Sequence, residues 1–380
     1  MFDYIRYYLS PATLLFGVAG LYLGGNWVWL GLATLPILAI GDTILPKDLA
    51  ERGKMKMGYA FIPVLMSCAL AFVSYSLLAW QLGSGMLSWY NVIGAVVSTG
   101  WIGTIVGIPA FHELFHRREP FLRNMGLILQ VMYGDGSREI AHLVGHHIDV
   151  DTVEDSDTAR RGETLYTFGF RAAWGSFSTG LKMECEAMQK RGLHRWSIRH
   201  RIWRALAGSI LFIAIMFVIG EWAAAGGGWA AAAGCFAATM LARFLLESFN
   251  YFQHYGQVRV IGSPVCKHHV WNHFGMLSRS MTFEITNHSG HHLNSYAPFY
   301  ELKPDRDAVM LPSVFICFMS ALIPPVWHQL IIKPALKEWD IRHASPEERE
   351  LAREANRKAG WEDWLAEHEA SGMQAAASAR

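Results

Sequence analysis

Three long stretches of the chain are apolar, and each is interrupted once by glycine or polar residues. No Asp, Glu, Lys or Arg occurs between residues 56 and 113, where the interruption falls at 82–85. None occurs between residues 6 and 42, where Gly24-Gly25-Asn26 divides the run. A third pair of segments, 204–222 and 229–247, is separated by three glycines. Each half is long enough to cross a bilayer as a helix, which takes about 20 residues.

We therefore predict an all-α integral membrane protein with six transmembrane helices in three hairpins. The predicted spans lie near 8–24 and 26–44, in the two halves of 57–112, and at 204–222 and 229–247. The alternative is a large soluble protein whose core helices are apolar all round. Composition argues against it, because charged residues make up 17% of the chain where soluble domains have about 25%.

The distribution of basic residues predicts the orientation of these spans. The hairpin tips near 25, 84 and 225 carry no Lys or Arg, whereas the connection 42–57 holds four and the segments 117–204 and 253–380 hold most of the rest. By the positive-inside rule, both termini and both long connections should be cytoplasmic. The first apolar run continues into a second span, so we interpret it as an anchor and not as a cleaved signal.

The remaining chain divides by polarity. We predict transmembrane helices 1–4 over 1–112, a cytoplasmic segment over 113–203, transmembrane helices 5 and 6 over 204–247, and a cytoplasmic histidine-rich helical cap over 248–308. Residues 309–332 are apolar but contain Pro324-Pro325, which favours a re-entrant or interface-lying segment over a seventh crossing. A soluble tail follows over 333–380, in which Ser345-Pro346-Glu347-Glu348 should begin a helix that stops near Gly360.

Histidines at helical spacing are the main chemical feature of the sequence. They occur as HELFH, HLVGHH and HSGHH, and one more follows the sixth span in NYFQHYG. Residues four apart on a helix project from one face, so each set can offer two imidazoles to one metal ion. All the sets fall on the side predicted to be cytoplasmic. The candidate ligands are His112, His116, His142, His146, His147, His254, His288, His291 and His292.

Nine nitrogen donors exceed the three or four protein ligands of a single ion, so we predict a dinuclear site. Imidazole binds Zn, Cu, Fe and Ni alike, so the residues alone leave the metal open. Carboxylates should orient the rings from behind; the candidates by proximity are Glu113, Asp149, Asp151, Glu247 and Glu284. The roles of His268, His269 and His273 are left open between such support and plain structure.

Other site classes explain less of the sequence. HELFH also matches the H-E-x-x-H signature of zinc proteases, which accounts for only two of the nine donors. A histidine-rich transporter or a bis-histidine haem protein would place ligands within the spans. The five cysteines are scattered with no C-x-x-C pair, which argues against a cysteine-held metal cluster. A net charge of +1 gives no reason to expect nucleic-acid binding. The basic stretch 190–204 is interpreted as a membrane-facing loop or, alternatively, a docking site for a redox partner.

The four histidine motifs, HELFHR, HLVGHH, NYFQHYG and HSGHH, resemble those of the membrane-bound non-haem di-iron hydroxylases of the alkane monooxygenase family, in order and spacing. The similarity is strongest to the xylene monooxygenase branch, through GGNWVWLG, ILPKD, REIAH, DSDT, SFNYFQHYG, EITNH, FYEL and LIPPVW. The alkane branch usually has Glu where this chain has Ala141 and Gln253, which favours the aromatic branch.

The resemblance implies a monooxygenase that hydroxylates the methyl group of alkyl-substituted aromatics of the xylene, toluene or cymene type, in aromatic hydrocarbon catabolism. It implies two Fe ions held by the same nine histidines, O2 as co-substrate, and a bacterial-type inner membrane. The chain carries no nicotinamide, flavin or iron-sulfur motif and no haem is expected, so the resemblance implies an NADH-dependent reductase with FAD and a [2Fe-2S] centre as partner. The alternatives are a terminal alkane 1-monooxygenase and, further off, a fatty-acid-type desaturase or an intramembrane zinc protease.

Overall fold

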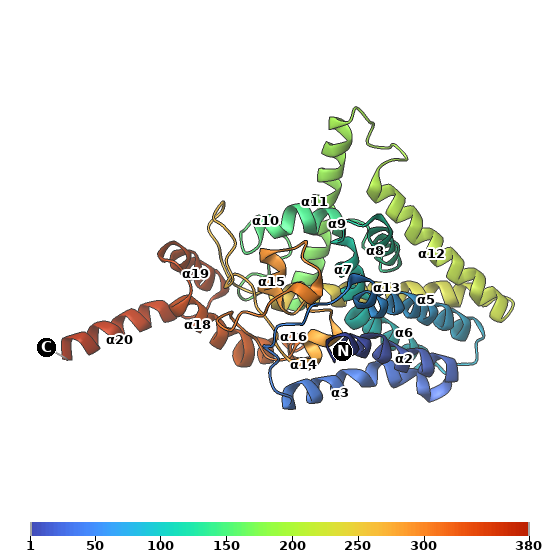
Figure 1. Cartoon of the computed structure of the whole chain (residues 1–380), viewed down its shortest axis with the longest axis horizontal. Helices are drawn as coiled ribbons and strands as arrows, with labels where there is room; N and C mark the ends of the chain where they lie inside the picture. The colour runs from blue at the N-terminus through green and yellow to red at the C-terminus, as the bar shows by residue number, and fades with distance from the viewer. Residues whose placement is uncertain (1, 379–380) are drawn as a thin grey trace.

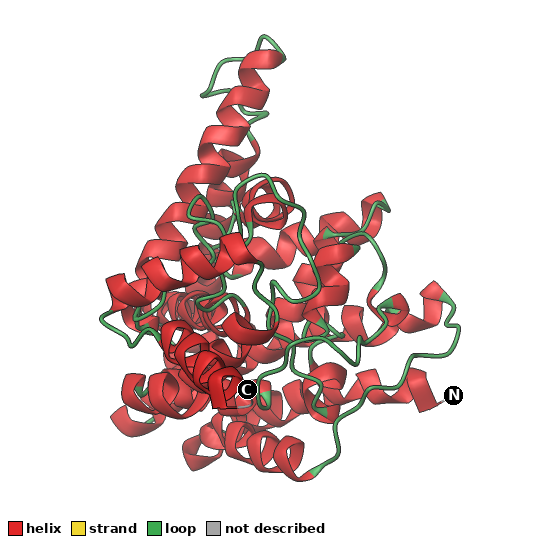
Figure 2. Ribbon diagram, turned by 90° about the vertical axis from the view of Figure 1, so that its left-hand side faces the viewer, coloured by secondary structure: helices red, strands yellow, loops and turns green. Residues whose placement is uncertain are grey.

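The computed structural model describes residues 2–378, with side chains over 3–371, and this part of the chain is all helix and loop (Figure 2). No strand forms in it; the only pairings between extended segments are isolated bridges such as Lys47 with Gly275. The all-α prediction is confirmed.

Five helices are long and apolar enough to cross a membrane. They are Gly25–Ile44, Met57–Gly83, Trp89–Phe115, Arg201–Ala223 and Gly228–Gln253. The first predicted span, near 8–24, is not among them; that region forms α2 (Leu9–Leu23), of 15 residues. Six spans were expected, and five helices meet this measure. Before α2 the chain forms the short helices α1 (Phe2–Ile5) and η1 (Arg6–Tyr8).

The membrane-length helices form one bundle in which α5 (Ile62–Gly83) is central (Figure 1). It packs against α2, α12 (Arg201–Ala223) and α13 (Gly228–Gln253). On the other side α6 (Trp89–Ile102) packs against α13 and against α3 (Leu30–Ile44), which is continued at its start by the 3-10 turn η2 (Gly25–Trp29). The α4 turn (Met57–Ala60) leads into α5.

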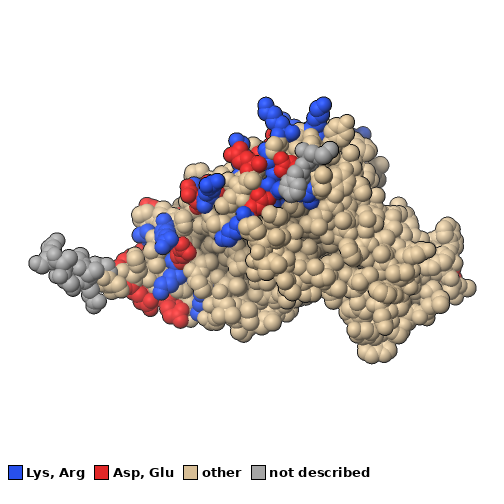
Figure 3. Space-filling model, turned by 60° about the horizontal axis from the view of Figure 1, so that its bottom comes forward, with Lys and Arg blue, Asp and Glu red and all other residues tan. Residues whose placement is uncertain are grey.

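The outer surface of this bundle suits lipid. Ile210 on α12 is 72% exposed and Trp222 near its end is 77% exposed, which costs solvation free energy in water but not in a bilayer. Charged side chains gather over one part of the molecule, and a large region is free of them in the view of Figure 3. These features support a multi-pass membrane protein.

The α6 helix reaches the histidine cluster through a stretch of π-helix. After η3 (Gly103–Gly107), which is π-helical, the chain continues as α7 (Ile108–Phe115). A Cβ at Gly107 would lie 2.0 Å from the Tyr133 hydroxyl oxygen, so only glycine allows this close packing. Single π turns inside α-helices are frequent at functional sites.

The segment after α7 wraps over one end of the bundle. It comprises α8 (Pro120–Met132), α9 (Arg138–Ile140), the π-helical η4 (Ala141–His146), α10 (His147–Asp149) and the long α11 (Leu165–Lys190). After α13 come α14 (Met276–Met281), α15 (His288–Leu293) and η5 (Phe299–Glu301). Figure 1 shows α7, α10 and α15 together at this end.

The apolar segment 309–332 is broken where the prolines occur. It forms α16 (Val314–Ala321), a short α17 (Pro324–Val326) and a π-helical η6 (Trp327–Ile332), which runs on into α18 (Lys333–Arg342). Ile323 is extended, with φ −121° and ψ 88°. Pro324 disfavours a helical conformation at the residue before it, so the break falls there.

The helix predicted to begin at Ser345 and to stop near Gly360 is confirmed as α19 (Pro346–Ala359). Ser345 and Glu348 form a capping box, and Gly360 ends the helix in the left-handed conformation, with φ 67°. Such caps satisfy the end groups that a helix leaves unpaired. The last element is α20 (Trp364–Ser378).

Candidate metal centre

The histidine motifs come from four separate segments that meet at one end of the bundle. His112 lies on the last turn of α7 and His116 caps it, while His142, His146 and His147 lie on η4 and the start of α10. His254 follows the last residue of α13, and α15 carries the remaining three. The sequence motifs therefore converge although the outermost lie more than 170 residues apart.

The HLVGHH motif is π-helical, where regular α-helical spacing was expected. A π turn closes its hydrogen bonds five residues apart. His142 consequently faces both of the later histidines of its own motif: its ring centroid lies 5.1 Å from that of His146 and 4.6 Å from that of His147. This local departure lets one short segment aim three imidazoles inward.

The ring nitrogens lie at distances typical of shared metal coordination. The Nε2 atoms of His112 and His142 are 3.0 Å apart, and those of His142 and His147 are 3.1 Å apart. On the other side, the Nε2 atom of His254 lies 3.2 Å from that of His146 and 2.8 Å from that of His288. With metal–nitrogen bonds of about 2.0–2.1 Å, adjacent ligands of one ion come about this close.

The imidazoles separate into two groups, each able to hold an ion. His112, His116, His142 and His291 have ligand atoms within 4.8 Å of one another, and so do His146, His254 and His292. His147 and His288 sit at the edges of these groups, through the contacts to His142 and His254 described above. The donor set thus fits two metal ions side by side.

Burial strengthens this fit. Eight of the nine rings are buried and His147 is partly buried. Several buried ring nitrogens have no hydrogen-bond partner among the described residues, including both nitrogens of His116 and of His292. A buried polar atom without a partner costs about 1–3 kcal/mol, and coordination to a metal ion would satisfy these atoms.

Most of the rings are held in the neutral form that binds metals. Burial, followed by the charges of neighbouring imidazoles, lowers the pKa of His142, His147, His291 and His292 well below the ordinary value. For His146 burial acts in the same direction, but the carboxylate of Asp155 outweighs it and raises the pKa.

Asp155 orients one of the central rings. Its Oδ2 atom lies 2.9 Å from Nδ1 of His146 and accepts a hydrogen bond of 2.6 Å from the Thr158 hydroxyl. The backbone N–H of Asp157 donates to the other oxygen at 3.0 Å. A proton held on Nδ1 leaves Nε2 free to face the cluster, which is how outer carboxylates tune metal-binding histidines.

Sequence reasoning missed Asp155. Among the described residues, none of the five carboxylates chosen by proximity forms a hydrogen bond to an imidazole. Three of them have other partners. Glu113 contacts Arg117 and the Phe299 N–H, Glu247 pairs with arginines, and Glu284 accepts from Tyr7 and Arg52. Asp155 is the first residue of the DSDT segment, which stands out in the sequence only through its resemblance to the xylene monooxygenase branch.

The three histidines left open have partners outside the cluster. His269 Nε2 lies 2.7 Å from the Glu348 carboxylate, which joins the loop after α13 to α19. His268 lies beside this pair. His273 Nδ1 donates to the Pro312 carbonyl oxygen at 2.6 Å. None of these contacts joins the three residues to the nine candidate ligands, whereas His268, His269 and Glu348 lie close enough together to form a separate polar group.

Replacing Asp155 with alanine should weaken metal binding about 10- to 100-fold, the usual cost of losing an outer partner of a metal ligand. Asp149→Ala is the matched control, because Asp149 lies in the same segment but, among the described residues, its carboxylate forms no hydrogen bond to an imidazole. Competition with a metal chelator measures both variants. Equal metal affinity for the two would contradict the role given to Asp155.

Membrane-length helices with two groups of imidazoles at one end define a membrane metalloprotein. Comparison with known proteins agrees: the family model described as fatty acid desaturase matches residues 87–312, a range that contains all nine histidines. The chain belongs to that family.

Particular relatives narrow the class. The chain is 40% identical over 365 residues to the xylene/toluene monooxygenase hydroxylase component of Pseudomonas putida, covering 95% of this chain and 97% of that protein. It is 26% identical over 323 residues to an alkane 1-monooxygenase of Pseudomonas putida (82% and 77% covered) and 27% over 352 residues to that of Ectopseudomonas oleovorans (87% and 84%). The chain is therefore a monooxygenase of this group, as its motifs predicted.

Proposed function

We propose that this protein is the hydroxylase component of a di-iron monooxygenase that hydroxylates a methyl group on an aromatic ring. The observation that carries the proposal is the 40% identity to the xylene/toluene hydroxylase along nearly the whole of both chains, against 26–27% to the alkane enzymes. A terminal alkane hydroxylase is the alternative that those other relatives favour.

The nine histidines are the proposed iron ligands, and the two groups would each hold one ion. The first ion would lie among His112, His116, His142 and His291, and the second among His146, His254 and His292, with His147 and His288 completing the shells. Iron bound there would supply the O2 chemistry, using O2 and two electrons. The proposed electron donor is an NADH-dependent reductase carrying FAD and a [2Fe-2S] centre, because the chain has no motif for such a carrier.

A small cavity against the histidines is the proposed place for the reacting methyl group. It is lined by apolar side chains of α7 and α13, including Phe111, Leu246 and Phe249, and it touches His112, His142 and His288. Its volume is about 30 Å³, enough for one or two water molecules. An aromatic ring would therefore enter only as these side chains shift, and they would then exclude water from the reacting atoms.

Gln253 also lines this cavity. It is one of the two positions at which this chain lacks the glutamate that is usual in the alkane branch of the family. The neutral amide donates to the Ile285 carbonyl oxygen at 3.5 Å, where a glutamate would bring a buried negative charge beside the substrate. The departure from the alkane pattern therefore lies next to the proposed reacting atoms.

We further propose that α2 crosses the membrane as a sixth span, giving three hairpins. With η1 it forms a continuous helical stretch from Arg6 to Leu23 that packs along α5. The proposed location is a bacterial inner membrane, with both termini and the metal site cytoplasmic. The boundaries given above, with a cap over 113–203 and 248–308 and a re-entrant or interfacial segment at 309–332, belong to the same proposal.

Product analysis tests the function. Purified protein with its reductase, NADH, O2 and a panel of toluene, p-xylene, cymene and octane should yield benzylic alcohols from the aromatic compounds. Faster conversion of octane to 1-octanol would favour the alkane alternative. An alkene product would indicate a desaturase, and cleavage of a peptide without NADH would indicate a zinc protease. The last outcome is disfavoured by Glu113, which contacts Arg117 and Phe299.

A further inference from the structure

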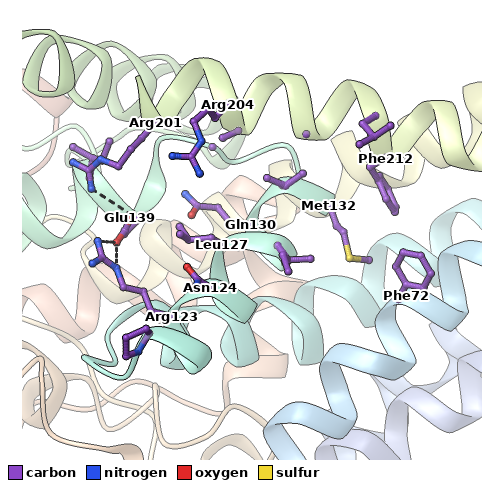
Figure 4. Close-up of a pocket in the computed structure, with 18 of the residues that line it drawn as sticks. Phe72, Arg123, Asn124, Leu127, Gln130, Met132, Glu139, Arg201, Arg204 and Phe212 are labelled. Carbon is purple, nitrogen blue, oxygen red and sulfur yellow. Dashed lines mark hydrogen bonds and ion pairs between the residues drawn. The ribbon is translucent and has the colours of Figure 1, made fainter. Parts of the chain in front are cut away.

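A groove of about 820 Å³ lies between α8, α12 and α5, and none of the nine histidines lines it. Figure 4 shows that its two ends differ. One end carries arginines, among them Arg123, Arg201 and Arg204, and the other end carries Phe72, Met132 and Phe212. The groove is therefore amphipathic along its length.

The groove runs from the charged end of a membrane span into its apolar part. Arg201 is the first residue of α12, and Ile215, which lines the far end, comes 14 residues later. At 1.5 Å per residue this is about 20 Å. One leaflet of a bilayer, with its headgroup region, is about 20 Å thick. The groove thus has the length of one lipid molecule from headgroup to chain end, with its basic end at the membrane surface.

Two arginines of the groove form no ion pair in the described part of the chain: Arg118, which lies over the ring of Tyr296, and Arg204. Arg123 pairs with Glu139, and Arg201 pairs with Glu184 at 2.8 Å and lies 3.6 Å from Glu139. Arg204 is exposed, and within the described part of the chain its guanidinium group forms no hydrogen bond or ion pair. Its side chain reaches from α12 into the groove (Figure 4). A guanidinium group suits the oxygens of a phosphate, which it binds through two parallel hydrogen bonds.

We propose that this groove binds one anionic phospholipid. The headgroup phosphate lies on Arg204, and one acyl chain lies over Leu127, Val131 and Phe212. An aromatic hydrocarbon has no anionic group to pair with Arg204 and could gain only a weaker cation–π contact, so the basic end favours an anionic lipid over a hydrocarbon substrate. The site is a lipid-binding site separate from the metal centre.

Native mass spectrometry of the detergent-solubilised full-length protein tests the proposal. Phosphatidylglycerol and phosphatidylcholine with the same acyl chains are titrated against the wild-type chain, Arg204→Glu and Arg199→Glu. Arg199 is an exposed arginine of the adjacent loop that does not line the groove, so it is the matched control. Iron content verifies that each variant is folded.

The wild type should retain one phosphatidylglycerol in preference to phosphatidylcholine. Arg204→Glu should weaken that binding roughly tenfold or more, since each basic residue near a membrane surface contributes measurably to the attraction of anionic lipid. Arg199→Glu should bind as the wild type does. Equal retention of the two lipids, or equal loss in the two variants, would overturn the proposal.

Two further measurements distinguish a phospholipid from other ligands of the groove. Inorganic phosphate added alone should not displace the lipid; full displacement at millimolar phosphate would make this a site for free phosphate. If Arg204→Glu left lipid binding unchanged but raised the KM for toluene, the groove would be assigned to substrate entry, and the lipid proposal would be wrong.

Discussion

Replacing His291 with alanine should reduce bound iron from two ions to about one per chain and abolish turnover. His291 belongs to the group with His112, His116 and His142, and its ring centroid lies 4.7 Å from those of both His112 and His116. Losing a direct ligand should cost more than the roughly 100-fold that the loss of an outer partner costs. Metal analysis and a coupled assay with reductase and NADH measure the two effects.

His194→Ala is the control for this experiment. His194 is an exposed residue of the loop between α11 and α12, so its loss should change neither iron content nor rate. An equivalent substitution in the second group, His146→Ala, should behave like His291→Ala. Wild-type iron content and activity in either ligand variant would exclude the assignment of the nine histidines.

Replacing Arg138 with methionine should destabilise the fold by about 3–5 kcal/mol, the cost of leaving buried charges without their partner. Arg138 is 3% exposed and donates to Asp135 at 2.7 Å, Asp157 at 2.7 Å and Glu247 at 2.5 Å. All three carboxylates are buried. After the substitution only Arg243 would remain to compensate two of them, through its contacts to Asp135 and Glu247.

This network ties the cap to the bundle, because Glu247 lies on α13 seven residues before His254, while Asp157 lies two residues after Asp155. The melting temperature of Arg138→Met in detergent should therefore fall, and the variant should also retain less iron. Arg342→Met is the control: the side chain of Arg342 is 70% exposed and pairs with Glu338, which is 59% exposed, and a surface pair contributes about 1 kcal/mol or less. Equal melting temperatures for the two variants would contradict the structural role of Arg138.

The helices and the histidine motifs could be predicted from the sequence because their signals are local. Uncharged runs marked the spans, and Ser345 with Gly360 marked both ends of α19. The HxxxH spacing alone indicates the candidate ligands. The length of α2 was less predictable, since the apolar run that contains it differs little from those of the longer helices.

The contacts that position the site could not be predicted in this way, because they join distant parts of the chain. Arg52 pairs with Glu284 across 232 residues and supports the turn that leads to α15. Phe283 and Glu284 in that turn both have positive φ, 48° and 60°, a conformation that no local signal suggested. The π turn at 141–146 likewise depends on packing and not on spacing alone.

The groove beside α12 illustrates the same limit. Its basic end is assembled from Arg118 and Arg123 around the start of α8 and from Arg201 and Arg204 of α12. In the sequence the second pair belongs to one basic stretch with no hint of an apolar channel behind it. Only the packing of α8 against α12 creates the amphipathic shape.

The metal content of the purified wild-type protein tests the central claim most directly. Two ions of iron per chain, both lost on treatment with a chelator together with all hydroxylase activity and both restored by ferrous iron, are the result that two imidazole groups at one end of the bundle predict. A fully active preparation with a single metal ion per chain would contradict it.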